Sequence, residues 1–460
     1  KKIKNPCSAC EFQAKQGISI WGIKLLFFFC IITQKGHLLL YNYVMEQNIR
    51  KEGVLNEKLA LKKLLTYMKS VYKIPQKIKC LTDERKRKSI PLFNIVMPVL
   101  LFLMLQYESF HTIFSTPESM SKRLKNCISG RIPKVDAVRD LLSRINPDEI
   151  RSIHEEMIDI IKRNRVFREG TIGGYVVAGL DGVELFSSTK KSCPNCLSRK
   201  KHTGETEYFY RSVVCMIIGK SPHVILGQEM LKPRDGSGKD EGELTGGKRL
   251  IEQLKKRHGH FADVIVADAL YLNAPFINTL KENGLEGVIR LKDERRMIFQ
   301  DAERLFKQDE GKKASFWKGK KKIEVWDLSG FEMEGCPYKL RVVRYYEQWK
   351  ENGKETERFM WLVTTLEAAD YRVLWEMMHR RWDIEENGFH QLKTYYHAKH
   401  CYCRDAVETI FNLIIIGFNV RELYLYRRSR NFAGSGISRK SINRIFCDDL
   451  LTEKSETDFM

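Results

Sequence analysis

The feature of this sequence that most constrains its fold is a set of short apolar runs between residues 173 and 291. Residues 175–180 read Tyr-Val-Val-Ala-Gly-Leu and stop at Asp181-Gly182, and residues 264–267 read Val-Ile-Val-Ala and stop at Asp268. Apolar runs this short and this rich in β-branched residues are typical of buried strands. Residues 183–186 are expected to return antiparallel to the first strand, because Asp-Gly is a favoured dipeptide of tight turns.

The stretches between these runs predict the rest of a mixed sheet. A third strand region is expected within 208–226, helices at 246–258 and 275–283, and a further strand at 287–291. Three antiparallel strands, a helix, and then strands that alternate with helices is the order of a ribonuclease-H-like fold. The sequence therefore predicts an α/β core with a mixed sheet, formed by residues 169–299 and 366–425.

Residues 300–365 interrupt this alternation. Four apolar segments read as strands separated by turns rich in Lys and Gly, one around Trp317 and the others at 323–326, 340–343 and 360–363. They predict a β-rich insertion between the last core strand and a helix that begins at Tyr371. A further apolar helix is expected at 406–423, followed by a basic C-terminal tail over 426–460.

Residues 45–168 predict a mainly helical domain that precedes the sheet. Helices are expected at 91–110, 135–146 and 147–163, and from Pro117 onward, where Ser115 or Thr116 could cap the first turn. A small helical domain with a basic face suits DNA binding, and a packing domain fits the same pattern equally well. Met45 opens the ordinary part of the sequence, so residues 1–44 are interpreted as upstream read-through or a leader, with a signal peptide as the alternative.

The charge balance indicates an anionic partner. The 460 residues carry a formal net charge of +21, with a pI of about 9.3. Basic side chains that neutralise the phosphates of a nucleic acid release counterions, which favours binding. The basic residues are also spread along the chain rather than clustered beside an apolar anchor. Nucleic acid is therefore favoured over a membrane surface as the partner. The apolar stretches at 18–33 and 92–106 are short or interrupted by polar residues, and the second is interpreted as a buried helix. Twelve scattered cysteines fit a reducing, cytoplasmic setting.

The most specific motif lies at 380–393, which read RRWDIEENGFHQLK. On a helix, Arg381 and Glu385 stand one turn apart on the same face and Lys393 lies two turns further on. Taken alone, this pattern is an exposed ion pair. The pattern resembles the glutamate helix of insertion-sequence DDE transposases, whose signature reads Y-x2-R-x3-E-x6-K. In that family the Glu is the last of three metal-binding carboxylates and the Arg and Lys hold the DNA end, which implies DNA binding by Arg381 and Lys393, with the adjacent Arg380.

The motif departs from that signature at two positions. Met378 occupies the Tyr position, and Lys393 lies eight residues after Glu385 but seven after Glu386. One extra residue near Asn387-Gly388 could be absorbed as a π-bulge, a feature that is frequent at functional sites. We therefore predict Glu385 as the third carboxylate, and Glu386 is the alternative.

Asp181 and Asp268 complete the predicted set of three carboxylates, because each follows a buried strand. Alone, Asp181 would be interpreted as a turn residue, and Asp263 competes with Asp268 but precedes its strand. Residues 266–271 also resemble the segment that carries the second Asp of the family. Oxygen ligands of this kind suit two Mg²⁺ or Mn²⁺ ions that act in an in-line phosphoryl transfer.

The resemblance implies a DNA transposase that hydrolyses the element's ends and joins the freed 3′ ends to target DNA. Its partners would be double-stranded DNA, both the terminal inverted repeats and the target, and a second copy of the chain on that DNA. The implied setting is the cytoplasm of a bacterium or archaeon, at the nucleoid. The alternatives are an inactive or domesticated DNA-binding relative and a two-metal nuclease without strand transfer.

Cys193-x2-Cys196 has the spacing of half a zinc site. Two more ligands would be needed, and His202, His400, Cys401 and Cys403 are candidates. One half-site is weak evidence, so reduced thiols without metal are the default interpretation and structural zinc is the alternative.

Overall fold

The computed structural model describes residues 60–86, 88–111, 133–190, 192–234, 239–308, 311–428 and 438–451. The chain divides into two compact units, residues 61–427 with 443–460 and residues 1–60 with 428–442. The sheet and the helices around it belong to the first of these units. The expected leader at 1–44, the helix expected from Pro117 and part of the C-terminal tail lie outside the described residues.

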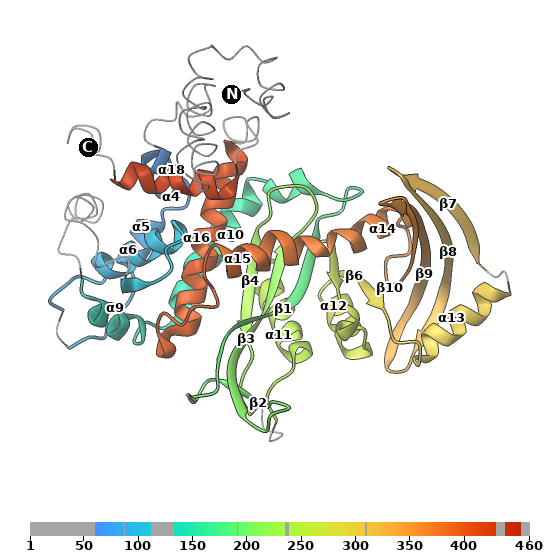
Figure 1. The fold of residues 1–460 in the computed structure, drawn as a ribbon, viewed down its shortest axis with the longest axis horizontal. Helices are drawn as coiled ribbons and strands as arrows, with labels where there is room; N and C mark the ends of the chain where they lie inside the picture. The colour runs from blue at the N-terminus through green and yellow to red at the C-terminus, as the bar shows by residue number, and fades with distance from the viewer. Residues whose placement is uncertain are drawn as a thin grey trace, which may run out of the picture. The chain divides into compact units, whose positions relative to one another are not determined.

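The core is a mixed sheet, as the sequence predicted. Strand β1 (Val177–Ser188) pairs antiparallel with β3 (Thr206–Ile217) and parallel with β5 (Val264–Ala267), and β5 pairs parallel with β6 (Glu286–Leu291). On the other side, β3 pairs antiparallel with β4 (Ile225–Met230) and, further along, with the short β2 (Leu197–Lys200). The core strands therefore run in the order β4-β3-β1-β5-β6 (Figure 1).

The prediction of a tight turn at Asp181-Gly182 is wrong. Strand β1 is continuous through this dipeptide, and Asp181 pairs with Val214 of β3. Glycine is required at 182 for another reason: a Cβ atom there would lie 2.3 Å from the carboxyl carbon of Glu243. The region 208–226 in turn divides between β3 and β4, so the three antiparallel strands of the core are β1, β3 and β4 rather than the three that were predicted.

Helices cover both faces of this core sheet. Side chains alternate between faces along a strand, and a Cβ at Gly182 would meet α11 (Glu243–His258), whereas a Cβ at Gly179 would meet Ile384 of the segment that follows α14 (Tyr371–Arg380). Helix α12 (Ala274–Glu282) packs on β6, where Leu280 lies over Gly287. Asp181 lies on the same face of β1 as Gly179, so it faces the segment that follows α14.

The predicted insertion is β-rich and continues the core sheet. It begins with α13 (Met297–Lys307) and contains β7 (Lys312–Lys318), β8 (Lys321–Met333), β9 (Cys336–Glu351) and β10 (Lys354–Thr364). Strand β10 pairs antiparallel with β6, with Trp361 opposite Leu291, so the order continues as β6-β10-β9-β8-β7. The result is one sheet of ten strands rather than a core with a separate insertion.

A buried arginine joins the insertion to the chain that enters α14. The guanidinium of Arg341 on β9 forms two hydrogen bonds with the carboxylate of Asp327 on β8, at 2.7 and 2.5 Å. It also donates to the carbonyl oxygens of Glu367 and Ala369, at 2.9 and 2.7 Å. Both side chains of the ion pair are more than nine-tenths buried. The loop before α14 is therefore held against the insertion.

Truncating this arginine is expected to destabilise the protein strongly. Arg341→Ala leaves the buried carboxylate of Asp327 and two carbonyl groups without their donor, which typically costs ~3–5 kcal/mol. The control is Lys339→Ala on the same strand, since Lys339 pairs with Glu332 at the surface and such pairs contribute ~0–1 kcal/mol. Urea unfolding of the two variants measures both changes, and equal losses of stability would contradict the assigned role.

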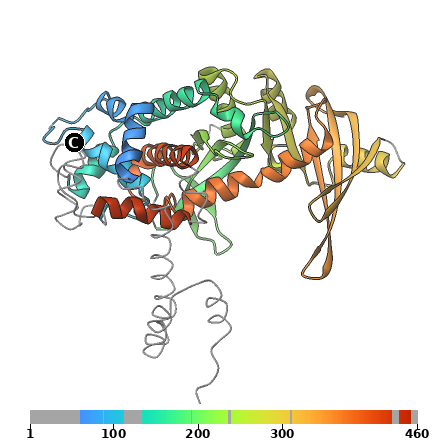
Figure 2. The ribbon, with the colours of Figure 1, turned by 90° about the horizontal axis from the view of Figure 1, so that it is seen from above.

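The helices of the N-terminal region pack around a long C-terminal helix. The N-terminal helices are α4 (Ala60–Val71), α5 (Ile74–Lys79), α6 (Phe93–Met104), α9 (Val135–Leu142) and α10 (Pro147–Arg163). The long helix is α16 (Val407–Arg427), and it is in contact with α6 and α10. Figure 2 shows α16 almost end-on, beside α10. Close approach of α6 is possible because Gly417 lies against Met104. After α16 the chain also forms α18 (Arg439–Leu451).

The apolar helix predicted at 91–110 is confirmed as α6, which is shorter (Phe93–Met104) and buried from Asn94 onward. Within the described ranges, no helix is both long and apolar enough to cross a membrane.

Candidate active site

The pairing of the sheet brings the two predicted aspartates to the same edge. Leu180 of β1 lies opposite Ala267 of β5 in a parallel ladder, and Asp181 and Asp268 are the next residues of their strands. Asp268 follows β5 directly, and its side chain accepts a hydrogen bond of 2.7 Å from the amide of Ala269, which caps the 3₁₀ turn at Ala269–Tyr271. Asp181 accepts one of 2.8 Å from the amide of Gly182. The prediction that both aspartates follow their strands holds for Asp268 and is wrong for Asp181, because β1 continues to Ser188.

The helix that carries the acidic motif crosses this edge in three parts. After α14, a π-helical segment spans Ile384–Phe389 and α15 spans His390–Thr394. Figure 1 shows this segment running across the strands of the core sheet. The predicted π-bulge is thereby confirmed, and it absorbs the extra residue that separates Glu385 from Lys393. Ile384 packs on Gly179 of β1, which fixes the segment beside Asp181.

Arg381 lies at the centre of the site, where it contacts two of the carboxylates. One nitrogen of its guanidinium lies 3.0 Å from a carboxylate oxygen of Glu385 and 3.4 Å from one of Asp181. Its charge also acts on Asp268. Only 6% of the residue is exposed, so it faces the carboxylates rather than the surface. The resemblance implied a DNA contact for Arg381, and in this structure the side chain neutralises the acidic site.

The two aspartates differ in acidity. Burial raises the pKa of Asp181 to about 6, and the nearby charges of Glu243 and Glu385 add to this, although the amide of Gly182 and Arg381 oppose it. Burial would also raise the pKa of Asp268, but hydrogen bonds from Ala269 and Lys292 outweigh it and hold that pKa below its usual range. Asp181 is therefore the carboxylate that gains most from a bound cation.

Lys292 belongs to the site and was not predicted. It follows β6 directly, as Asp268 follows β5, and its ammonium lies 3.1 Å from a carboxylate oxygen of Asp268. The parallel pairing of β5 with β6 places both residues at one edge, so the strand ends alone could have indicated Lys292. Glu243 was also missed, because nothing in its local sequence separates it from other acidic residues at helix starts.

The other predicted residues divide between the site and the surface. The partly buried ammonium of Lys393 is close enough to interact with Asp181 and Glu385, and burial lowers its pKa. Glu386 is exposed, in contrast to the ion-paired Glu385. Arg380 is partly exposed and lies 3.7 Å from the carboxylate of Asp383. Of the two glutamates, Glu385 rather than Glu386 therefore lies on the side of Asp181.

Carboxylate oxygens are the ligand type that Mg²⁺ and Mn²⁺ prefer, so the donor chemistry of this edge fits such ions. In the described part of the chain, no three His, Cys, Asp or Glu side chains lie close enough together to hold a metal ion. The guanidinium of Arg381 lies between the carboxylates of Asp181 and Glu385 instead. A bound cation would have to take over part of the neutralisation that Arg381 provides.

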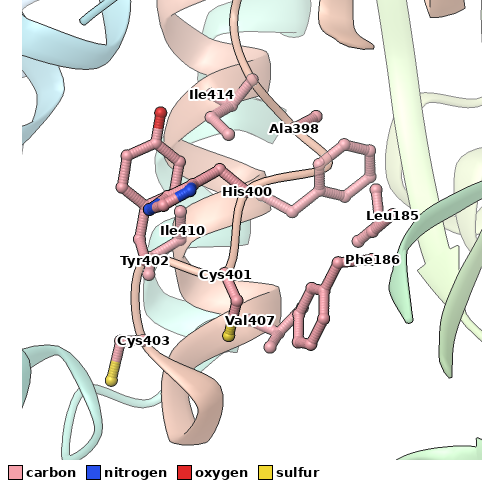
Figure 3. Close-up of a pocket in the computed structure, with 11 residues that line it drawn as sticks. Leu185, Phe186, Ala398, His400, Cys401, Tyr402, Cys403, Val407, Ile410 and Ile414 are labelled. Carbon is pink, nitrogen blue, oxygen red and sulfur yellow. The ribbon is translucent and has the colours of Figure 1, made fainter. Parts of the chain in front are cut away.

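The cysteines of the zinc interpretation lie near a small, mostly apolar pocket that Phe186 and Cys401 help to line (Figure 3). The sulfur of Cys193 is 2.7 Å from the hydroxyl of Tyr210, whose ring packs on Phe186. Cys193 also interacts electrostatically with Cys401, and Figure 3 shows the Cys401 sulfur on the side of its loop opposite to the Tyr402 ring. Reduced thiols without metal stay the prediction and structural zinc the alternative, and metal analysis of the purified chain against Cys193→Ser tests between them.

Comparison with known proteins finds that part of this chain is similar to one protein family. Residues 191–419 match the family model described as "Transposase DDE domain". The matched part contains Asp268, Glu385 and Lys393, and it begins ten residues after Asp181. No curated protein matches the chain. Among solved structures, the NurA nuclease from Sulfolobus solfataricus is similar over 61% of this chain and 97% of its own, with 12% identity and a TM-score of 0.22, which is too low to support an argument.

Proposed function

We propose that this protein is a metal-dependent DNA transposase that cleaves the ends of its element and joins them to target DNA. The observation that carries the proposal is the shared contact of Arg381 with Asp181 and Glu385, at the sheet edge where Asp268 also lies. It is supported by the transposase DDE domain over 191–419. The strand order β4-β3-β1-β5-β6, three antiparallel strands followed by two parallel ones, supports a ribonuclease-H-like core.

The finer assignment to the Y-x2-R-x3-E-x6-K group draws support from the π-helix. The extra residue within Ile384–Phe389 accounts for the displaced Lys393, which nevertheless lies near Asp181. The Tyr position is occupied by Met378, which is buried and brings no hydroxyl group. This chain would therefore do without the contact that the Tyr of the signature makes.

In the proposed mechanism, Asp181, Asp268 and Glu385 would hold two Mg²⁺ or Mn²⁺ ions, whose chemistry would be to lower the pKa of the attacking water or 3′-hydroxyl and to stabilise the leaving oxygen. Positively charged side chains of the protein supply the remaining electrostatic stabilisation. Arg381 favours the ionised form of Asp181 and so opposes the effect of its burial, and Lys292 favours the ionised form of Asp268. Lys393 and Arg380 are proposed to bind the phosphates of the DNA end, where a positive charge compensates the charge of the backbone.

We also propose the partners and setting that the chemistry implies. Double-stranded DNA suits the net charge of +21, and a second copy of the chain would bring the two element ends together. The eight cysteines in the described part of the chain are all free, which agrees with the proposed cytoplasmic setting.

The test is Mg²⁺-dependent cleavage and joining of DNA that carries the inverted repeats flanking the reading frame, with shuffled ends and EDTA as controls. Cleavage at the repeats followed by joining supports the proposal. Cleavage without joining would indicate a nuclease instead. Specific binding without cleavage would indicate a DNA-binding relative.

A further inference from the structure

A fourth carboxylate lies behind the two aspartates. Glu243 is the first residue of α11 and is only 8% exposed. Its carboxylate pairs with Arg211 of β3 at 2.6 Å and accepts a hydrogen bond of 3.4 Å from the hydroxyl of Tyr271. It also covers Gly182, where even a methyl group would collide with it. One side chain thus contacts the strand directly after Asp181 and the turn directly after Asp268.

We propose that Glu243 is a positioning residue that fixes the two catalytic aspartates relative to each other. This inference rests on the proposed function of the site. Glu243 lies on the face of β1 opposite to the Asp181 side chain, so it acts through the backbone and through its charge rather than on substrate.

The surroundings of Tyr271 show why its position matters. The residue is fully buried, and its ring lies against Phe276 with 5.0 Å between ring centroids. It also lies against Gly247 of α11, where a Cβ would be 3.0 Å from the ring. A buried hydroxyl in such a place needs its acceptor, and Glu243 is the acceptor in this structure. The 3₁₀ turn that begins at Asp268 is therefore held against the same helix end as Gly182.

The charge of Glu243 gives it a second link to the site. The carboxylates of Glu243 and Asp181 carry like charges and repel each other, although the two side chains lie on opposite faces of β1. The two residues are therefore expected to be energetically coupled.

A simpler role is available to any acidic residue in the first turn of a helix, since it is favoured by the helix dipole. That role predicts a loss of stability and nothing else. A positioning role also predicts a slower chemical step at unchanged affinity for the DNA ends. These readouts separate the two roles.

The experiment compares Glu243→Gln and Tyr271→Phe with the wild-type chain in single-turnover cleavage of end-bearing DNA. The control is Glu252→Gln, which changes an exposed residue of the same helix. We expect Glu243→Gln to cleave ~10–100-fold more slowly, the range typical of residues that orient metal ligands, with unchanged end binding. A Glu243→Gln variant that cleaves as fast as Glu252→Gln would overturn the proposal.

A second measurement keeps the test independent of activity. The double-mutant cycle of Glu243→Gln and Asp181→Asn, followed by thermal unfolding at pH 8, measures the coupling between the two groups. We expect the gain from Asp181→Asn to be smaller when Glu243 is already neutral. Strict additivity overturns the inference whether or not the protein cleaves DNA. Coupling in a wild-type chain that never cleaves would instead reject the proposed function and leave the contact standing.

Discussion

Glu385→Gln is expected to lower metal-dependent DNA cleavage by on the order of 10³-fold or more, because removing a group that acts as part of a catalytic set typically costs that much or more. Glutamine keeps the size of the side chain and removes its charge, so the proposed metal site would lose an anionic ligand while the helix is unchanged. The carboxylate of Glu385 is the one that shares Arg381 with Asp181.

Glu386→Gln is the matched control for this experiment, since it makes the same change one residue later on an exposed side chain. We expect its cleavage rate to stay within about threefold of wild type, because a surface substitution away from a buried or functional group usually has little effect. Cleavage rates and metal titrations of both variants measure the difference. Loss of activity in Glu386→Gln alone would move the third ligand to Glu386 and reject the register that the π-helix supports.

Asp181→Asn is expected to abolish cleavage and, at the same time, to stabilise the folded chain at neutral pH. The pKa of Asp181 is about 6 in the folded protein, against about 3.9 for an unfolded Asp. Because the raised pKa favours the protonated form, its contribution to stability is fully present below about pH 4 and is lost as the pH rises to about 6. Asparagine resembles the protonated form, so the variant gains about 3 kcal/mol at pH 7 and only about 0.5 kcal/mol at pH 4.

Asp268→Asn is the natural counterpart, because its shift has the opposite sign. The pKa of Asp268 lies below its usual range, so its ionised form stabilises the folded protein above the pKa of the unfolded state, and this is lost as the pH falls through the folded pKa. Asparagine therefore costs stability at neutral pH. Thermal unfolding of both variants between pH 4 and 8 measures the two trends, and shifts of the same sign would contradict the assigned electrostatics.

The local sequence pattern was sufficient to predict the structure of segments for which few alternative conformations exist. The run at 264–267 became β5 with the predicted bounds, since four buried apolar residues between turns leave little choice. The π-helix was also predictable, because the spacings of Arg381 and Lys393 from one glutamate do not both fit a regular helix. Both predictions used only residues within a few positions of each other.

The errors arose where distant parts of the chain decide the outcome. Asp181-Gly182 has the sequence of a turn, but its glycine makes room for Glu243, which lies some 60 residues away. Glu243 was not predicted as a site residue for the same reason, because it is distant in sequence from Asp181. Pairing of β10 with β6 was not predicted either, because strand partners are set by tertiary contacts that a single sequence does not display.

The pairing of β10 with β6 also protects the core sheet from self-association. Without it, β6 would present a row of unpaired amide and carbonyl groups, which is a template for strands of neighbouring copies. The insertion moves that exposed edge to β7, a strand of seven residues that carries Lys313 and Lys318. Lysine on an edge strand discourages such pairing. A shortened relative that lacks the insertion would therefore need another cover for β6 to stay monodisperse.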